Sequence, residues 1–110
     1  MNAGSRLTVQ VVDGNPVMVR VTGEVDLLAA PELARPLREL IVRRKPPAIE
    51  VDLAGVHFMD STGIQVLVSA HTDARAADIP FRVRDVSSSV RRVLAMTGLL
   101  ETLGVKDLEN

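Results

Sequence analysis

The sequence contains no cysteine, no tryptophan and no tyrosine, and phenylalanine occurs only at Phe58 and Phe81. Without cysteine, disulfide bonds and thiolate metal sites are excluded, and this usage fits a reducing compartment. The two histidines, His57 and His71, are too few for a histidine-rich metal site. The core must therefore consist of aliphatic side chains and methionine, and we expect neither a metal nor a cofactor.

The chain also lacks a charge excess and a long apolar run. Its 13 basic and 14 acidic residues give a formal net charge of -1, which predicts no positive surface for nucleic acid. No apolar stretch approaches the ~20 residues that cross a bilayer. The N-terminal MNAGSRLTVQ has no basic region followed by an apolar one, unlike a secretory signal. We therefore expect a cytoplasmic protein that binds neither nucleic acid nor membrane.

What the sequence does contain is enough apolar material for one core. Hydrophobic residues make up 46% of the 110 residues, and a chain of this size commonly forms one domain. We expect a single domain over residues 1–110, with its core from about Leu7 to Leu100.

Four segments have the features of β-strands. The first two, Leu7–Val12 and Pro16–Gly23, flank an Asp-Gly pair that favours a hairpin turn. In the third, AIEVDLAGV at residues 48–56, large apolar side chains alternate with other residues, as on a half-buried strand. The fourth is PFRVRDV, at residues 80–86. The first pair predicts an antiparallel hairpin at the N-terminal end of a sheet.

The first helical segment, residues 29–44, contains two prolines. Pro31 suits the first turn of a helix, where an N–H has no intrahelical partner. Pro36 lies in the middle of the segment and removes the hydrogen bond to the carbonyl of Glu32. We therefore expect either a regular helix that begins near Glu32 or Leu33, or a kinked helix.

Two further helices are predicted over residues 63–77 and 87–100. Serines cap the start of the second one, which stops at Gly98. A short strand or helix around Thr102–Leu108 is a further expectation. The order β-β-α-β-α-β-α predicts an α/β fold with a mixed sheet: an N-terminal hairpin, later strands parallel, and helices packed on the sheet.

The segment MDSTG, at residues 59–63, stands where the third strand gives way to the second helix. By itself it predicts a helix start, in which Asp60 caps the helix, Ser61 and Thr62 fill the first turn, and Gly63 relieves crowding. Its position adds a functional interpretation, because sites in open parallel sheets gather at the carboxyl ends of strands.

A second polar segment, GEVD, directly follows the hairpin at residues 23–26. On its own it predicts a strand end closed by glycine and solvated acids. If the second and third strands are neighbours, Glu24 or Asp26 comes near Asp60. Ser61 would then lie beside carboxylates on an exposed edge of the sheet.

Ser61 is poorly equipped as a catalytic nucleophile. MDSTG is not the Gly-x-Ser-x-Gly elbow, and no histidine is placed to act as a base. His57 is expected on the opposite face of its strand, and His71 lies more than two helical turns downstream of Ser61. No lysine accompanies the nearby glycines, so a phosphate-binding loop is also unsupported. We therefore expect a protein that is not an enzyme.

Three longer segments carry a resemblance to a known family: VTGEVDLLAAPEL, VDLAGVHFMDSTGIQVLVSA and FRVRDVSSSVRRVLAMTGLL, in this order. Together they resemble the anti-sigma factor antagonists, whose fold is the STAS domain shared with the cytoplasmic tails of sulfate transporters. The likeness runs from about Leu7 to Leu100. It implies a STAS-type fold and a regulator of transcription that acts by partner switching, as in stress responses.

In that family, the hydroxyl residue directly after the motif's aspartate is phosphorylated by a partner that is both anti-sigma factor and serine/threonine kinase. The resemblance implies that this residue is Ser61 here, with Thr62 as the rival acceptor. The unphosphorylated form binds the anti-sigma factor and frees a sigma factor, and a phosphatase reverses the modification. The partner-binding residues expected on this basis are Glu24, Asp26, Asp60, Ser61, Thr62 and Gly63.

Electrostatics favours such a switch at Ser61. A phosphate adds nearly two negative charges at a helix N-terminus, where the dipole returns roughly 0.3–1 kcal/mol. Each unit of charge about 6 Å from a carboxylate costs ~0.7 kcal/mol in bulk water and ~2.8 kcal/mol at an effective dielectric near 20. The free protein should therefore tolerate the phosphate, while a tight complex that covers the site should not.

Two alternatives belong to other functional classes. One is a scaffold module that assembles with other STAS domains in a signalling complex without acting on a sigma factor. The other is a small acyl or phosphoryl transferase with Ser61 as nucleophile, which the missing general base disfavours.

Overall fold

The computed structural model describes residues 7–105. Its elements follow the predicted β-β-α-β-α-β-α order, with a π-helical turn (η1) after the first helix and a short fourth helix at the end. In chain order they are β1 (Leu7–Val12), β2 (Val17–Val25), α1 (Ala30–Glu39), η1 (Leu40–Arg44), β3 (Ile49–Met59), α2 (Ser61–Ala76), β4 (Phe81–Arg84), α3 (Ser88–Met96) and α4 (Leu99–Thr102).

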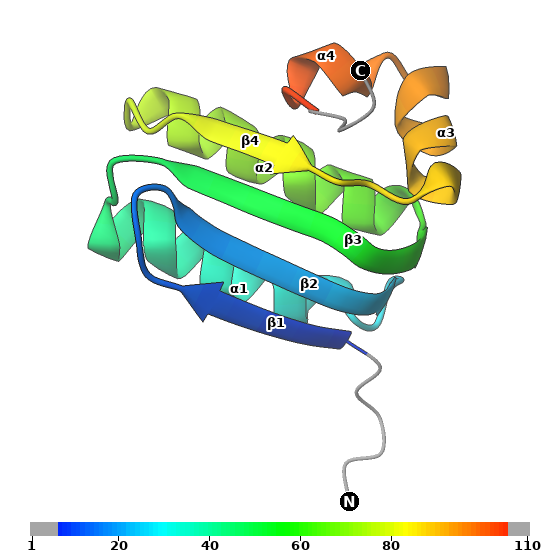
Figure 1. Cartoon of the computed structure of the whole chain (residues 1–110), viewed down its shortest axis with the longest axis horizontal. Coiled ribbons are helices and arrows are strands. Elements are labelled where there is room, and N and C mark those ends of the chain that lie inside the picture. The colour runs from blue at the N-terminus through cyan, green and yellow to red at the C-terminus, as the bar shows by residue number, and fades with distance from the viewer. Residues whose placement is uncertain (1–6, 106–110) are drawn as a thin grey trace, which may run out of the picture.

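The four strands form one sheet in the order β1-β2-β3-β4 (Figure 1). β1 and β2 pair antiparallel, from Leu7 opposite Gly23 to Val12 opposite Met18. The β2–β3 and β3–β4 pairs are both parallel. The expected α/β fold, with an N-terminal hairpin and parallel later strands, is therefore confirmed.

Helices α1 and α2 lie side by side and cover one face of the sheet (Figure 1). The sheet residues that face them are aliphatic because every second position in the first part of each strand, residues 17–21 of β2 and 49–53 of β3, is apolar, which is the period of a half-buried strand. The fully buried side chains from these strands include Val19, Val21, Val25, Ile49, Val51 and Leu53. The core thus consists of aliphatic side chains, as the scarcity of aromatic residues requires.

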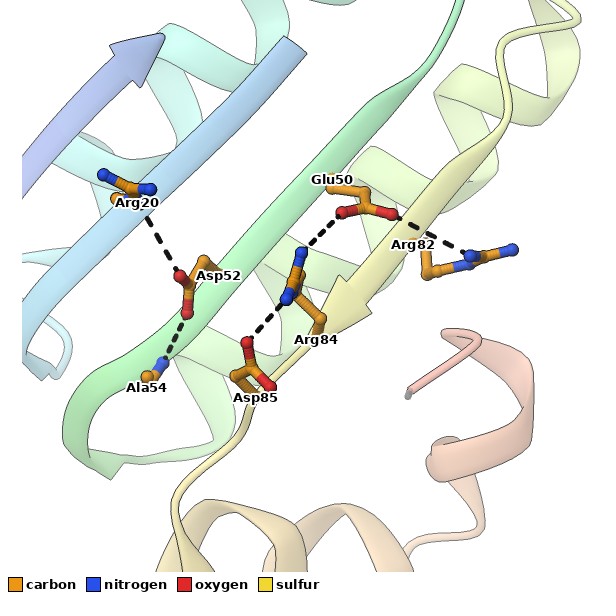
Figure 2. Close-up of polar contacts among 7 residues, drawn as sticks. All are labelled: Arg20, Glu50, Asp52, Ala54, Arg82, Arg84 and Asp85. Carbon is orange, nitrogen blue, oxygen red and sulfur yellow. Dashed lines mark hydrogen bonds and ion pairs between the residues drawn. The ribbon is translucent and has the colours of Figure 1, made fainter. Parts of the chain in front are cut away.

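The opposite face of the sheet carries charged side chains that pair across strands (Figure 2). Glu50 on β3 lies 3.8 Å from Arg82 and 3.3 Å from Arg84, both on β4. Arg84 also donates a 2.9 Å hydrogen bond from Nε to Asp85. These two acids, Asp85 foremost, raise the pKa of Arg84 above its usual value. Arg82 and Arg84 of this face therefore each have an acidic partner.

Helix α1 differs from the expectation around Pro36. It begins at Ala30 and continues through Pro36, so of the two alternatives the regular helix that begins near Glu32 or Leu33 is wrong. A proline inside a helix costs about 3 kcal/mol. Complete burial of a leucine side chain returns roughly 1.5–3 kcal/mol, and Leu33 and Leu37 of this helix are only 0% and 1% exposed. Packing against the sheet therefore outweighs the local cost of the proline.

The chain leaves this helix through η1. The N–H of Lys45 donates to the carbonyl of Leu40 at 2.7 Å, which closes a wider turn than an α-helix. Lys45 itself adopts the left-handed conformation, with φ of 46°. Arg44 forms an ion pair with Asp13 of the β1–β2 turn, so the end of this helix is tied to the hairpin.

The C-terminal part agrees with the predicted cap and differs at the last element. The side chain of Ser87 accepts a hydrogen bond from the N–H of Val90 at 3.4 Å, which confirms a serine cap on α3. The helix ends before Gly98, whose φ is 73°. Helix α4 ends at Thr102, where the expected short element around Thr102–Leu108 was to begin. Residues 103–105 form neither a strand nor a helix, and positions 106–108 lie outside the described residues. No helix between residues 7 and 105 is long and apolar enough to span a membrane.

Candidate partner-binding site

The carboxyl ends of β2 and β3 bring the two polar segments of the sequence together. Val25 pairs with Met59, and Glu24 pairs with Phe58. The N–H of Asp60 donates to the carbonyl of Val25 at 3.1 Å. The two strands are therefore neighbours. This fulfils the condition under which GEVD and MDSTG meet at the carboxyl ends of β2 and β3.

Asp60 is the N-cap of α2, as expected. One of its carboxylate oxygens accepts from the N–H of Thr62 at 2.9 Å and from the N–H of Gly63 at 3.3 Å. The same oxygen accepts a hydrogen bond from the Thr62 hydroxyl. This hydroxyl, followed by the backbone N–H groups of Gly63, Thr62 and Leu27, lowers the pKa of Asp60, while partial desolvation opposes the shift. The cap is thus a carboxylate at neutral pH.

The two candidate hydroxyl groups differ in their surroundings. The Thr62 hydroxyl donates to Asp60, and its side chain is partly buried. Ser61 is exposed, and its hydroxyl forms no hydrogen bond within residues 7–105. Ser61 is also the first residue of α2, so its hydroxyl lies beside the N-terminus of a long helix. Of the two, only the Ser61 hydroxyl is both accessible and uncommitted.

Gly63 is buried where α2 meets the sheet. A Cβ atom at this position would lie 2.6 Å from Cγ of Met59 and 2.8 Å from Cγ1 of Val25. Both distances are shorter than side-chain carbons tolerate, so only glycine lets the first turn of α2 pack this closely on β2 and β3. Gly63 therefore positions Ser61 and offers no side chain to a partner.

The acids of GEVD lie in the strand end and the loop that leads into α1. The Asp26 carboxylate accepts from the N–H of Ala29 at 2.9 Å, and the Asp26 carbonyl accepts from the N–H of Ala30 at 2.8 Å. Asp26 therefore organises the start of α1 while remaining partly exposed. Glu24 is partly buried, opposite Phe58. Both acids thus lie at the carboxyl end of β2, next to the end of β3 that Asp60 follows.

Exposed apolar side chains near this edge were missed by the sequence analysis. Leu27 and Leu28, in the loop after Asp26, are 67% and 81% exposed, and Phe58 at the end of β3 is 48% exposed. The signal was available, because two leucines directly follow the GEVD acids outside any periodic pattern. We refer to Leu27, Leu28 and Phe58 as the apolar rim.

The histidines do not form a catalytic arrangement with Ser61. His71 packs edge-to-face against Phe81, with ring centroids 6.1 Å apart. His57 is exposed on β3, and its carbonyl accepts a hydrogen bond from Ser89 at 3.0 Å. Within residues 7–105, no group of His, Asp and Glu side chains is arranged as a metal site.

Comparison with known proteins places this chain in a family. A family model described as the STAS domain matches residues 6–109, so the chain belongs to the STAS domain family. A curated relative is the anti-sigma-F factor antagonist RsfB of Mycobacterium tuberculosis, which is 34% identical over 103 residues, covering 93% of this chain and 83% of the relative. The anti-sigma-B factor antagonist of Listeria monocytogenes is 29% identical over 97 residues, covering 88% and 84%.

A solved structure agrees with this assignment. The crystal structure of an anti-sigma factor antagonist from Mycobacterium paratuberculosis superposes with a TM-score of 0.83 at 28% identity, over 96% of this chain and 89% of that chain. The resemblance found in the sequence is therefore confirmed at the level of family and fold. The relatives are named as regulators, and the expectation that this chain is not an enzyme agrees with them.

Proposed function

We propose that this protein is an anti-sigma factor antagonist that is switched by phosphorylation of Ser61. The unphosphorylated form binds an anti-sigma factor that is also a serine/threonine kinase, and this binding releases a sigma factor. Transfer of phosphate to Ser61 abolishes binding, and a phosphatase restores it. These steps take place in the cytoplasm. The proposal rests on the relatives that are named as antagonists of anti-sigma factors and on the local structure at Ser61.

The observation that carries the site assignment is the contrast between Ser61 and Thr62. A kinase needs a hydroxyl that it can reach and orient, and the exposed Ser61 has one without an internal hydrogen bond. The Thr62 hydroxyl would first have to leave the Asp60 carboxylate. Loss of that hydrogen bond would weaken the cap of α2. Ser61 is therefore the acceptor that can be modified without disturbing the fold.

The charges around Ser61 support a switch. The N-terminus of α2 favours an added phosphate, whereas the ionised Asp60 next to it, and Glu24 and Asp26 at the neighbouring strand end, oppose further negative charge. In free protein these opposing effects are screened by water. A partner that covers the site removes that water and makes the repulsion between phosphate and carboxylates stronger. Phosphorylation then weakens the complex more than it weakens the fold.

The apolar rim supports a protein partner. Exposed large apolar side chains that gather beside a polar site are typical of protein interfaces. Leu27, Leu28 and Phe58 would lose most of their exposed area when a partner covers the edge. Their position, next to the GEVD and MDSTG segments, means that the surface that gives affinity and the residue that is modified are covered together.

The test measures binding of a candidate anti-sigma kinase, encoded near this gene, by calorimetry. Ser61→Asp should weaken binding by at least about tenfold, which is 1.4 kcal/mol, with an unchanged circular dichroism spectrum. Ser88→Asp is the matched control because Ser88 is the exposed first residue of α3, as Ser61 is of α2. It adds the same charge at another helix start and should leave the affinity unchanged.

Two results would contradict the proposal. Equal affinity of Ser61→Asp and the parent protein would mean that charge at Ser61 does not control binding. Equal losses from Ser61→Asp and Ser88→Asp would mean a general effect of charge. If the protein instead assembled only with other STAS domains and never with a kinase, the scaffold alternative would replace the proposal.

A further inference from the structure

The two edges of the sheet are protected very differently. On the outer side of β4, the N–H of Val83 donates to the carbonyl of Leu103 at 3.1 Å, and Leu103 is fully buried. β4 is also short and carries two arginines, Arg82 and Arg84. Short length, charge and a covering segment are the features by which proteins prevent edge-to-edge pairing of sheets. This edge is therefore closed to another strand.

β1 has none of these features. It has the sequence Leu-Thr-Val-Gln-Val-Val, without a charged residue or a proline. Its pairing with β2 is regular over all six positions, without a bulge. Among residues 7–105, no strand pairs with its outer side. Alternate residues of such an edge strand direct backbone N–H and C=O groups away from the sheet, where they can pair with another strand.

The apolar cover of β1 also becomes incomplete along the strand. On the face that α1 and α2 cover, Leu7 is 6% exposed, Val9 is partly buried against the core, and Val11 is 37% exposed. Val12, on the opposite face, is also 37% exposed. An additional antiparallel strand would cover this end of β1 if it placed an apolar residue beside Val11.

We propose that β1 pairs antiparallel with β1 of a second copy of this chain, to give a two-fold symmetric dimer with a continuous sheet. A two-fold axis perpendicular to the sheet keeps the helices of both copies on the same face. Because alternate side chains of a strand point to opposite faces, an even-numbered residue of one β1 must then lie opposite an even-numbered residue of the other, and an odd-numbered residue opposite an odd-numbered one. The register that pairs the most exposed part of β1 places Gln10 opposite Gln10 and Val9 opposite Val11. Each exposed Val11 then gains an apolar neighbour.

A second copy fits this edge better than an unrelated charged segment. In this register residues 8–12 of one copy lie opposite residues 8–12 of the other, and none of these side chains is charged. No like charges are therefore brought together, and all three cross-strand pair types (Val9 with Val11, Gln10 with Gln10, Thr8 with Val12) combine uncharged residues. The contact is small, so we expect a concentration-dependent dimer rather than an obligate one.

Gln10 provides a sharp test because it would face itself. Within one chain Gln10 is opposite Arg20, which lies 3.9 Å from Asp52. Gln10→Glu therefore places a carboxylate beside an arginine in the monomer, which the fold tolerates, but two carboxylates face each other in the dimer. Sedimentation velocity over a concentration series should show that Gln10→Glu and Gln10→Lys each weaken dimerisation on the order of tenfold.

An equimolar mixture of Gln10→Glu and Gln10→Lys should dimerise more tightly than either variant alone, because opposite charges then meet at the two-fold axis. The matched control is Ala54→Lys, an exposed position on β3 away from the β1 edge, which should dimerise like the parent. A parent protein that stays monomeric up to about 1 mM would overturn the proposal. So would a dimer that neither Gln10 variant weakens, because another surface would then form it.

Discussion

Substitution of Gly63 by alanine is informative because it has two opposite effects on stability: alanine favours the helix, whereas its methyl group overpacks the contact with the sheet. Gly63 lies in the first turn of α2, directly behind Ser61 and Thr62, where the helix packs on the sheet. An alanine there would place its Cβ 2.6 Å from Cγ of Met59 and 2.8 Å from Cγ1 of Val25. Gly63→Ala therefore tests whether this close approach holds the start of α2 in position.

The magnitudes predict a net loss of stability. Alanine is favoured over glycine inside a helix by about 1 kcal/mol, and by less in the first turn. Overpacking a core costs typically about 1–3 kcal/mol. Val25 is 0% exposed, and its β-branched side chain cannot rotate away easily. We expect Gly63→Ala to lower the free energy of unfolding by about 1–2 kcal/mol, and Tm by roughly 4–10 °C.

Thermal unfolding followed by circular dichroism measures this effect. The comparison requires Gly63→Ala, Val25→Ala and the double variant, because the double-mutant cycle isolates the contact between the two positions. In the Val25→Ala background the 2.8 Å contact with Cγ1 is absent, while the 2.6 Å contact with Cγ of Met59 remains. Gly63→Ala should therefore cost less stability in this background than in the parent protein. A higher Tm for Gly63→Ala in the parent background would refute the packing argument.

Two further predictions concern backbone conformation and the cap. Because the pKa of folded Asp60 is lowered, its cap stabilises the fold above the pKa of the unfolded carboxyl and is lost as pH falls through the folded value. Asp60→Asn should therefore lower Tm at about pH 7 and by less at about pH 3; a difference independent of pH would contradict this. Lys45, with φ of 46°, occupies the left-handed conformation, which costs a non-glycine residue roughly 1–2 kcal/mol. Glycine avoids this cost, but it also raises the conformational entropy of the unfolded chain, which offsets part of the gain. Lys45→Gly should raise the free energy of unfolding in urea by about 0.5–1 kcal/mol, whereas an unchanged or lower midpoint would count against it.

The sequence predicted those features that depend on short-range patterns. The Asp-Gly turn and the alternating valines were sufficient for the hairpin, and the strand-helix junction at MDSTG was sufficient for the Asp60 cap. The meeting of GEVD and MDSTG was conditional on β2 and β3 being neighbours, and their parallel pairing fulfils that condition. These predictions succeeded because the local preference and the tertiary structure favour the same conformation.

The remaining features depend on tertiary contacts. The later helix start that Pro36 favours is not found, because α1 begins at Ala30 and continues through Pro36 with its leucines buried against the sheet. The contrast between Ser61 and Thr62 depends on which hydroxyl reaches Asp60, and this is set by the three-dimensional arrangement of the first turn of α2. The leucine pair after the GEVD acids is a sequence signal for the apolar rim, but the exposed fraction of each side chain follows only from the tertiary structure.

The central claim is that Ser61 is the residue modified by the partner kinase. The most direct measurement incubates the protein with the candidate anti-sigma kinase and ATP and maps the phosphate by mass spectrometry. We expect one phosphate on Ser61, absent from Ser61→Ala and retained in Thr62→Val. Phosphate on Thr62 or on the serines at the start of α3, incorporation that survives Ser61→Ala, or no incorporation at all would contradict the claim.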